Sequence, residues 1–293
     1  MILHLKVSPI LCLLWTTIIS YFSPLFCYSG QESIHIFYTT NLNCTLTDCQ
    51  CGGDTVGGFI RVVTKLKQLR ESYLDMVLLD AGDFLNSYPL TKENEKMIYL
   101  MSFAKFNYLN PGEQEFVDGA EFLFTELENM SGKLKLISGN LTSNQKGEFL
   151  FETMGYIKRG NFEISVTGLI NPTAFDFMQK DQIRVLSPNT ALENLESRMN
   201  QSDFQILLFH GYWKDAELLA ESFPWIDLII ISHSQEMKFK LLNKTAMVEA
   251  GTEGRYLGHL EASFVNSHWR FTNNFIPITK SVDLSEEALK IIN

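Results

Sequence analysis

The chain has 293 residues, of which 45% are hydrophobic and 12% aromatic. This composition can bury a large core in one or two domains, which excludes an intrinsically disordered protein. The formal net charge of −10 argues against a broad surface for nucleic acid or for anionic lipid. We therefore expect a folded protein that does not bind nucleic acid.

The amino terminus, residues 1–30, differs from the rest of the chain. His4 and Lys6 give it a weakly basic start, residues 10–26 are largely apolar, and the small residues Ser29 and Gly30 follow. This order is typical of a secretory signal peptide. An uncleaved membrane anchor is the alternative, because the apolar stretch approaches the ~20 residues that a helical span needs. We expect an exported protein: periplasmic, at the cell surface or secreted.

Beyond residue 30, apolar runs typical of β-strands alternate with amphipathic stretches typical of helices. The predicted strands are 34–38, 76–79, 134–138, 164–169, 204–209, 228–231, 246–249 and 260–264, and the predicted helices are 59–73, 94–106, 191–199 and 215–223. Such alternation, followed by strands alone, indicates an α/β fold with mixed sheets. No linker-like composition, charge run or repeat interrupts residues 31–293, so we expect one domain there.

Three cysteines, Cys44, Cys49 and Cys51, lie within a short stretch after the first predicted strand. In an oxidising compartment one disulfide with a leftover thiol is expected. Ligation of a soft metal by the thiolates is the alternative. It is the weaker hypothesis, because C-x4-C-x-C is neither a zinc-knuckle nor a haem-attachment spacing.

Polar side chains follow several predicted strands: Asn41, Asp83, His210 and His233 each lie within about four residues of a strand end. Ligands of open α/β sheets collect beyond the carboxyl ends of the strands. A lone histidine there is more often structural, whereas two histidines with an aspartate in the same relation favour a metal site. The residues alone leave both interpretations open.

Five short motifs occur in a fixed order along the chain: residues 40–43, 80–83, 112–116, 209–211 and 232–235. Their order and spacing resemble the calcineurin-like metallophosphoesterases, specifically the 5′-nucleotidase branch, and the resemblance extends from about residue 34 to residue 258. It implies a four-layer αββα sandwich and two divalent metals bridged by an aspartate. It does not extend to nucleotide specificity, because little sequence follows residue 258 to form a nucleobase-binding domain.

The family pattern is D-x-H, G-D, G-N-H-E, a lone H and G-H-x-H. By position, the aspartate and histidine of D-x-H correspond to Asn41 and Asn43, and the bridging aspartate of G-D corresponds to Asp83. The second histidine of G-H-x-H is replaced by Gln235. The resemblance thus implies that the first metal site would consist of one carboxylate and three amides. Amide oxygens are poor ligands for zinc, iron or manganese, so we expect no metal there.

The second metal position falls on Asp83, Glu113, His210 and His233, all of which have side chains that ligate such metals. The resemblance therefore implies one divalent ion, zinc, manganese or iron. The alternative is that these four residues are polar remnants of an abandoned site.

The catalytic histidine of the family falls on Gln114, which can donate a hydrogen bond but cannot titrate. Loss of a general acid typically costs about 10²–10⁴ in rate. Two functions follow as hypotheses. The first is a weak or altered single-metal hydrolase of a small phosphoester. The second is a non-catalytic pseudoenzyme that binds an unidentified ligand or has a structural role.

Overall fold

The structure is a computed structural model that describes residues 33–48, 53–176 and 183–293. The predicted signal peptide lies outside the described residues, and so do Cys49 and Cys51. The start of the domain at residue 31 stays a prediction. No helix in the described part of the chain is long and apolar enough to span a bilayer.

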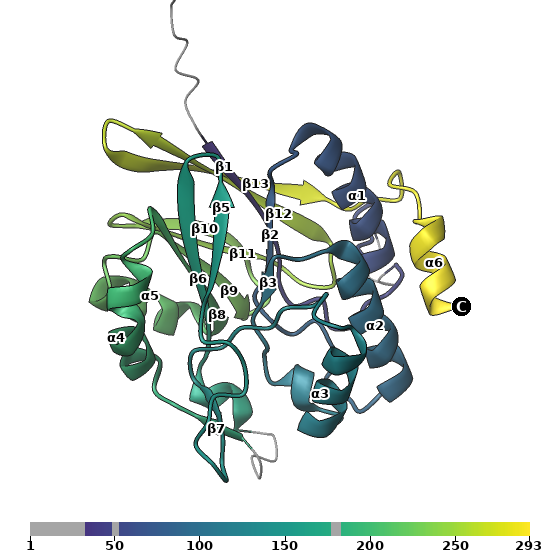
Figure 1. Cartoon of the computed structure of the whole chain (residues 1–293). Helices are drawn as coiled ribbons and strands as arrows, with labels where there is room; N and C mark the ends of the chain where they lie inside the picture. Colours follow the sequence, from purple (N-terminus) through teal and green to yellow (C-terminus); the bar gives the residue numbers. More distant parts are fainter. Residues whose placement is uncertain (1–32, 49–52, 177–182) are drawn as a thin grey trace, which may run out of the picture. The chain divides into compact units, whose positions relative to one another are not determined.

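Two mixed sheets form the centre of the fold (Figure 1). The first has the strand order β13 (His268–Pro277), β12 (Tyr256–Val265), β1 (Ser33–Thr39), β2 (Val77–Asp80) and β3 (Tyr108–Leu109). The second has the order β10 (Met237–Leu242), β11 (Thr245–Ala250), β9 (Leu228–His233), β8 (Phe204–Gly211), β6 (Phe162–Ile170) and β5 (Gly155–Arg159). In the second sheet, antiparallel pairs flank the parallel ones on both sides, whereas in the first they lie on one side only. A small third sheet pairs β4 (Leu141–Ser143) with β7 (Ile183–Val185).

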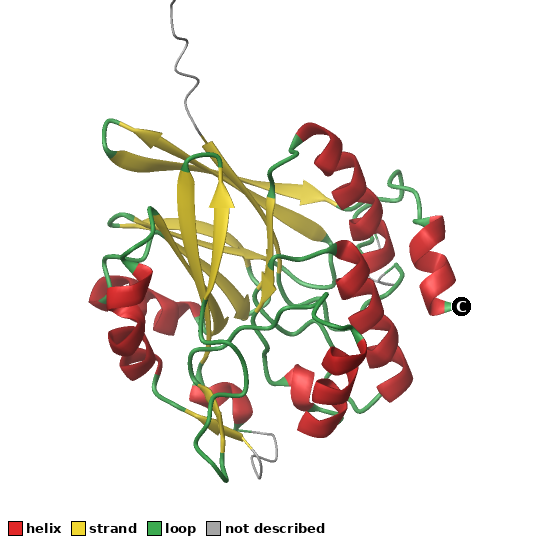
Figure 2. Cartoon of the chain, viewed as in Figure 1, coloured by secondary structure: helices red, strands yellow, loops and turns green. Residues whose placement is uncertain are grey.

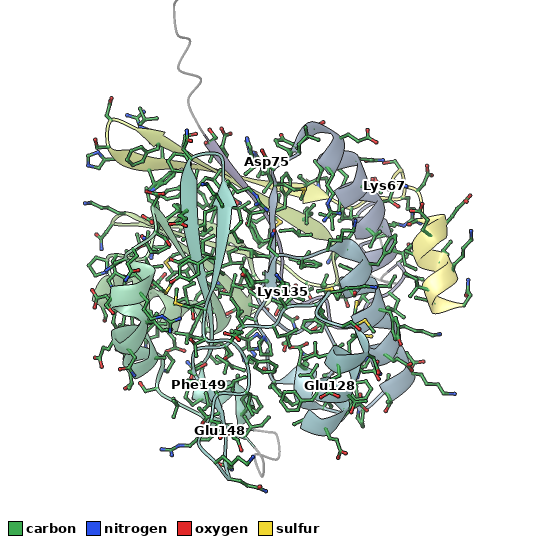
Figure 3. All side chains as sticks on the ribbon, in the orientation of Figure 1. Lys67, Asp75, Glu128, Lys135, Glu148 and Phe149 are labelled. Atoms are coloured by element: carbon green, nitrogen blue, oxygen red, sulfur yellow. The ribbon has the colours of Figure 1, made fainter. Side chains whose placement is uncertain are left out.

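Helices cover the outer faces of both sheets (Figure 2). The helices α1 (Phe59–Ser72), α2 (Thr91–Ala104) and α3 (Ala120–Asn129) cover the first sheet, and α4 (Pro188–Met199) and α5 (Trp213–Ser222) cover the second. The last helix, α6 (Glu286–Ile292), packs against α1 and α2. Short 3₁₀ helices occur at η1 (Gln114–Phe116) and η2 (Pro172–Phe175). In α1, Val62 and Leu66 are buried, whereas Lys67 is exposed, which is the amphipathic pattern that predicted this helix (Figure 3).

The inner faces of the sheets pack against each other. Ile36 and Tyr38 of β1 share one buried cluster with Ile206 of β8 and Ile230 of β9, while Phe37 faces the helices. This alternation follows from the two-residue period of a strand. The order helix, sheet, sheet, helix confirms the predicted four-layer αββα sandwich.

The prediction of a strand at residues 134–138 is wrong, because this segment forms isolated bridges and no regular strand. Leu136 bridges to Leu109 and Ile137 bridges to Glu152, but no continuous ladder forms. The neighbouring strand β3 has only two residues, so it offers too few backbone groups for longer pairing. The segment is therefore extended but pairs only at isolated positions.

Candidate metal centre

Four side chains meet at the carboxyl ends of the parallel strands. Asp83 follows β2, Glu113 precedes η1, His210 lies near the end of β8, and His233 is the last residue of β9. A potential ligand atom from each lies within 4.8 Å of those of the other three. These are the four residues assigned to the second metal position from the sequence, and the fold brings all of them together.

The backbone around this cluster is tightly constrained. A Cβ at Gly112 would collide with the Asp83 carboxylate and lie 2.6 Å from Cε1 of His210. Only glycine therefore lets the loop that carries Glu113 approach so closely. Asp83 and His233 have φ values of 59° and 96°, which non-glycine residues rarely adopt.

Contacts within the cluster join acids to imidazoles. Nε2 of His210 lies 2.7 Å from Oε2 of Glu113 and 3.4 Å from Oδ1 of Asp83. Nδ1 of His233 lies 3.5 Å from Oε1 of Glu113. Oδ1 of Asp83 and Nδ1 of His210 are buried and have no hydrogen-bond partner among the described residues. A buried carboxylate oxygen without a donor is costly unless a cation binds it, so these residues fit a divalent ion.

Opposed effects set the charges of the cluster. Burial raises the pKa of Asp83 well above its ordinary value, although His210 acts to lower it. Burial acts to lower the pKa of His210, but the carboxylates of Asp83 and Glu113 outweigh it and raise that pKa to about 10. For Glu113, burial is outweighed by His210 and His233, so its pKa falls below the ordinary value. Without an ion the cluster thus holds a proton on His210, which a metal would have to displace.

Glu115 has a structural role beside the cluster. Its buried carboxylate accepts hydrogen bonds from the backbone N–H groups of Asp83 (3.1 Å), Leu85 (2.9 Å) and Gly112 (2.6 Å). These contacts hold the loop after β2 against the loop after β3.

Asn41, predicted to be a lost ligand of the first metal, uses its whole side chain within the protein. Oδ1 accepts from the hydroxyl of Ser232 (2.8 Å) and from the backbone N–H of His233 (2.7 Å). Nδ2 donates to Oε1 of Glu249 and to the carbonyl oxygen of Gly251, both at 3.0 Å. No lone pair or proton of this amide remains for an ion.

The other substituted positions behave differently. Gln114 donates from Nε2 to Oδ2 of Asp83 at 2.9 Å, so the second oxygen of the expected bridging carboxylate is already hydrogen-bonded. Asn43 donates to the hydroxyl of Thr252 at 2.8 Å. Gln235 is exposed. Oδ1 of Asn43 is buried without a hydrogen-bond partner among the described residues, but amide oxygens are poor ligands for zinc, iron or manganese. The first metal position therefore does not fit a transition metal.

Glu249 and Trp213 were not anticipated from the sequence. Glu249 lies fully buried in β11 and accepts from Asn41 and, at 2.6 Å, from the indole N–H of Trp213. Burial raises its pKa to about 7 even though these donors act to lower it. A single acidic residue inside the apolar run 246–250 was the available signal, since a buried carboxylate needs partners.

Cys44 is buried in the helix-facing core, and its thiol forms no disulfide with another described residue. Burial raises the pKa of this thiol to about 12, which disfavours the thiolate that a metal requires. Because Cys49 and Cys51 are not described, the disulfide and the soft-metal site stay predictions.

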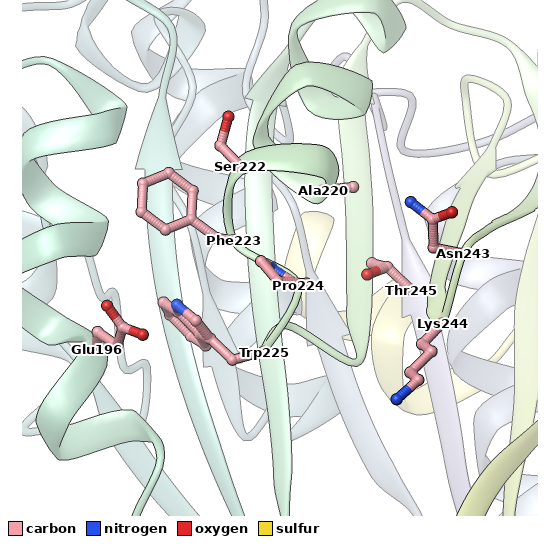
Figure 4. A pocket seen from close by; sticks show the side chains of 9 residues that line it. All are labelled: Glu196, Ala220, Ser222, Phe223, Pro224, Trp225, Asn243, Lys244 and Thr245. Atoms are coloured by element: carbon pink, nitrogen blue, oxygen red, sulfur yellow. The ribbon is translucent and has the colours of Figure 1, made fainter.

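A separate cavity of about 610 Å³ lies at the ends of α5 and the β10–β11 hairpin (Figure 4). Phe223, Trp225 and Lys244 line it, and none of the four clustered residues does. It is therefore distinct from the candidate metal centre.

No family model matches the chain. It is 25% identical over 246 residues to an apyrase of Tabanus yao, covering 74% of this chain and 44% of the relative. It is 22% identical over 318 residues to a human 5′-nucleotidase, covering 90% and 54%. The chain thus spans about half the length of these curated relatives.

A calcineurin-like phosphoesterase of Bacillus subtilis has the same fold, with a TM-score of 0.74 at 19% identity, covering 89% of this chain and 96% of that one. Together with the αββα layers and the strand-end cluster, these relatives agree with the motif order in the sequence. The chain is therefore similar to the amino-terminal part of 5′-nucleotidases and shares the fold of the calcineurin-like phosphoesterases.

Proposed function

We propose that this protein is an exported single-metal phosphoesterase of low activity. The observation that carries the proposal is the asymmetry of the centre. Asp83, Glu113, His210 and His233 converge on one point, whereas Asn41 is fully hydrogen-bonded to protein.

The four clustered residues would hold one zinc, manganese or iron ion, because two imidazoles and two carboxylates are ligands that these metals favour. Such an ion supplies Lewis-acid polarisation of a phosphoryl oxygen. The protein orients the four ligands through the constrained backbone at Asp83, Gly112 and His233.

Low activity follows from two features of the same centre. Two metals clamp the attacking and leaving oxygens in the family mechanism, and a single ion cannot do both. Gln114 cannot donate a proton to a leaving group, and its amide is engaged with Asp83.

The proposal includes three further parts. The substrate is a small phosphoester, residues 1–30 direct export, and one domain spans residues 31–293.

A non-catalytic binding or structural role is the second candidate. The complete hydrogen bonding of Asn41 favours it, because the protein has stabilised the altered centre in a form that needs no first metal. Both candidate functions include an ion bound at Asp83, and they differ only in whether the protein hydrolyses a phosphoester.

Metal analysis of the purified protein tests the site. We expect about one equivalent of metal per chain, with the affinity reduced by at least roughly 10-fold in Asp83→Ala and in His233→Ala. The matched control is His268→Ala, because His268 is exposed in β13 and lies outside the cluster. Absence of metal from the unsubstituted protein would contradict the proposal.

A phosphodiester assay on the same samples separates the two candidates. Slow hydrolysis that disappears in Asp83→Ala but not in His268→Ala supports the hydrolase. Bound metal without hydrolysis supports the non-catalytic alternative.

A further inference from the structure

We infer that Asn41 and Glu249 form a coupled pair that replaces the first metal ion as the link between the two sheets. Asn41 follows β1 of the first sheet, and Glu249 lies in β11 of the second. Both side chains are fully inaccessible to solvent. The pair does not depend on an ion at Asp83 and its neighbours.

The contacts of Asn41 reach three separate segments of the second sheet. Its amide binds the end of β9 through Ser232 and the backbone of His233, and it binds β11 and the following turn through Glu249 and Gly251. The Ser232 hydroxyl also lies 2.8 Å from the carbonyl oxygen of Gly82, in the loop after β2, so its single proton is shared between this oxygen and Oδ1 of Asn41. The two sheets are thus joined at this edge by direct hydrogen bonds.

Glu249 fixes the orientation of the Asn41 amide. In its ionised form the carboxylate can only accept, so it faces the N–H₂ group of Asn41, and the indole of Trp213 donates to its other oxygen. The carbonyl oxygen of Asn41 then faces the two donors from β9. Each hydrogen-bonding atom of the amide meets a group of opposite kind.

Aspartate does not fit at position 41 while Glu249 is present. It would place a carboxylate oxygen about 3 Å from the carboxylate of Glu249 and from the carbonyl oxygen of Gly251, so no donor lies between them while both acids are ionised. Glutamine at position 249 restores a donor for that aspartate, and its carbonyl oxygen still accepts from Trp213. The two positions are therefore expected to change together.

A double-mutant cycle on the full chain tests the coupling. We expect Asn41→Asp to lower the thermal midpoint by roughly 5 °C or more, and Glu249→Gln to lower it by less. The double variant should regain at least about half of the loss caused by Asn41→Asp. Losses that simply add would overturn the inference.

Two further readouts keep the test decisive. If Asn41→Asp yields no soluble protein, recovery of soluble double variant supports the pair, and failure of both overturns it. The midpoint differences should be the same in chelator and in added zinc. Differences that vanish in chelator would show that a metal mediates the effect, which also overturns the inference.

The matched control replaces a second acid, Asp227, which is partly buried. Asp227→Asn removes a carboxylate that accepts from the backbone N–H of Gln205, at 2.9 Å, and that is not among the hydrogen-bond partners of Asn41 in the described part of the chain. Combined with Asn41→Asp, it should give additive losses and no recovery. Recovery in this control would overturn the inference, because the effect would then be general relief of negative charge.

Discussion

Gln114 is the residue at which the centre departs most directly from acid–base catalysis. Its Nε2 donates to Asp83, and its buried Oε1 has no hydrogen-bond partner among the described residues. A histidine at this position would keep a donor toward Asp83 and add a group that exchanges protons near neutral pH.

We therefore expect Gln114→His to raise the rate of phosphodiester hydrolysis by about 10-fold or more, since a positioned general acid contributes about 10²–10⁴. Steady-state kinetics with metal content measured in parallel would check this. Gln114→Asn, which shortens the amide without adding a titratable group, is the control. An unchanged rate in Gln114→His at full metal occupancy would favour the non-catalytic candidate.

Among single residues, the strand-end pattern predicted Asp83, His210 and His233, because polar side chains after apolar parallel strands collect at one edge of a sheet. Glu113 was assigned only by the resemblance to the metallophosphoesterases. The sequence did not predict the partners of Asn41. Ser232 and Gly251 lie about two hundred residues from Asn41 along the chain, and their contacts depend on how the two sheets are aligned. No local pattern encodes that alignment.

Among the elements, the pairing of β12 with β1 depends on a single glycine. Gly258 lies opposite Tyr38 in the register, and the buried tyrosine ring fills the space where a Cβ at Gly258 would lie. The Tyr38 hydroxyl donates to Asn273 of β13 at 2.9 Å, so the ring also connects β1 to the edge of the sheet.

We expect Gly258→Ala to lower the free energy of unfolding by about 1–3 kcal/mol, because the fully buried ring of Tyr38 has little room to move. Denaturant titration measures the loss. In a Tyr38→Leu background the same substitution should cost less, because the ring is gone. An equal cost in both backgrounds would rule out this steric explanation.

The predicted elements differ in how well the sequence marked them. Strands buried on both faces, such as β8 and β9, are continuous apolar runs and were predicted nearly to their ends. The edge strand β13 was missed, because it alternates aromatic residues with His268, Arg270 and other polar residues that face solvent. Its pairing with β12 becomes evident only from the register.

For the whole molecule, the core does not depend on the candidate metal centre. One buried cluster joins the two sheets, and two others join each sheet to its helices, all from apolar side chains. Burial of this kind is the dominant favourable term in folding. The fold should therefore persist when the ion is removed.

Accordingly, chelation should leave the far-UV circular dichroism unchanged and the thermal unfolding cooperative. The free energy of unfolding should fall only by the mass-action contribution of the ion, which is about 2.7 kcal/mol when free metal is 100-fold above Kd, and the thermal midpoint should fall accordingly. Scans with and without chelator measure this. Loss of secondary structure on chelation would show instead that the metal holds the fold together.

The contact between Asn41 and Glu249 also constrains how this protein can evolve. Aspartate at position 41 alone sets two buried carboxylates against each other, and glutamine at position 249 alone leaves either Asn41 or Trp213 facing an amide N–H₂ group. Each single step toward aspartate at position 41 and glutamine at position 249 thus passes through a less stable protein. A lineage carrying this pair would place a carboxylate at position 41 only through paired substitutions, and a two-metal centre would need further changes at Asn43 and Gln235.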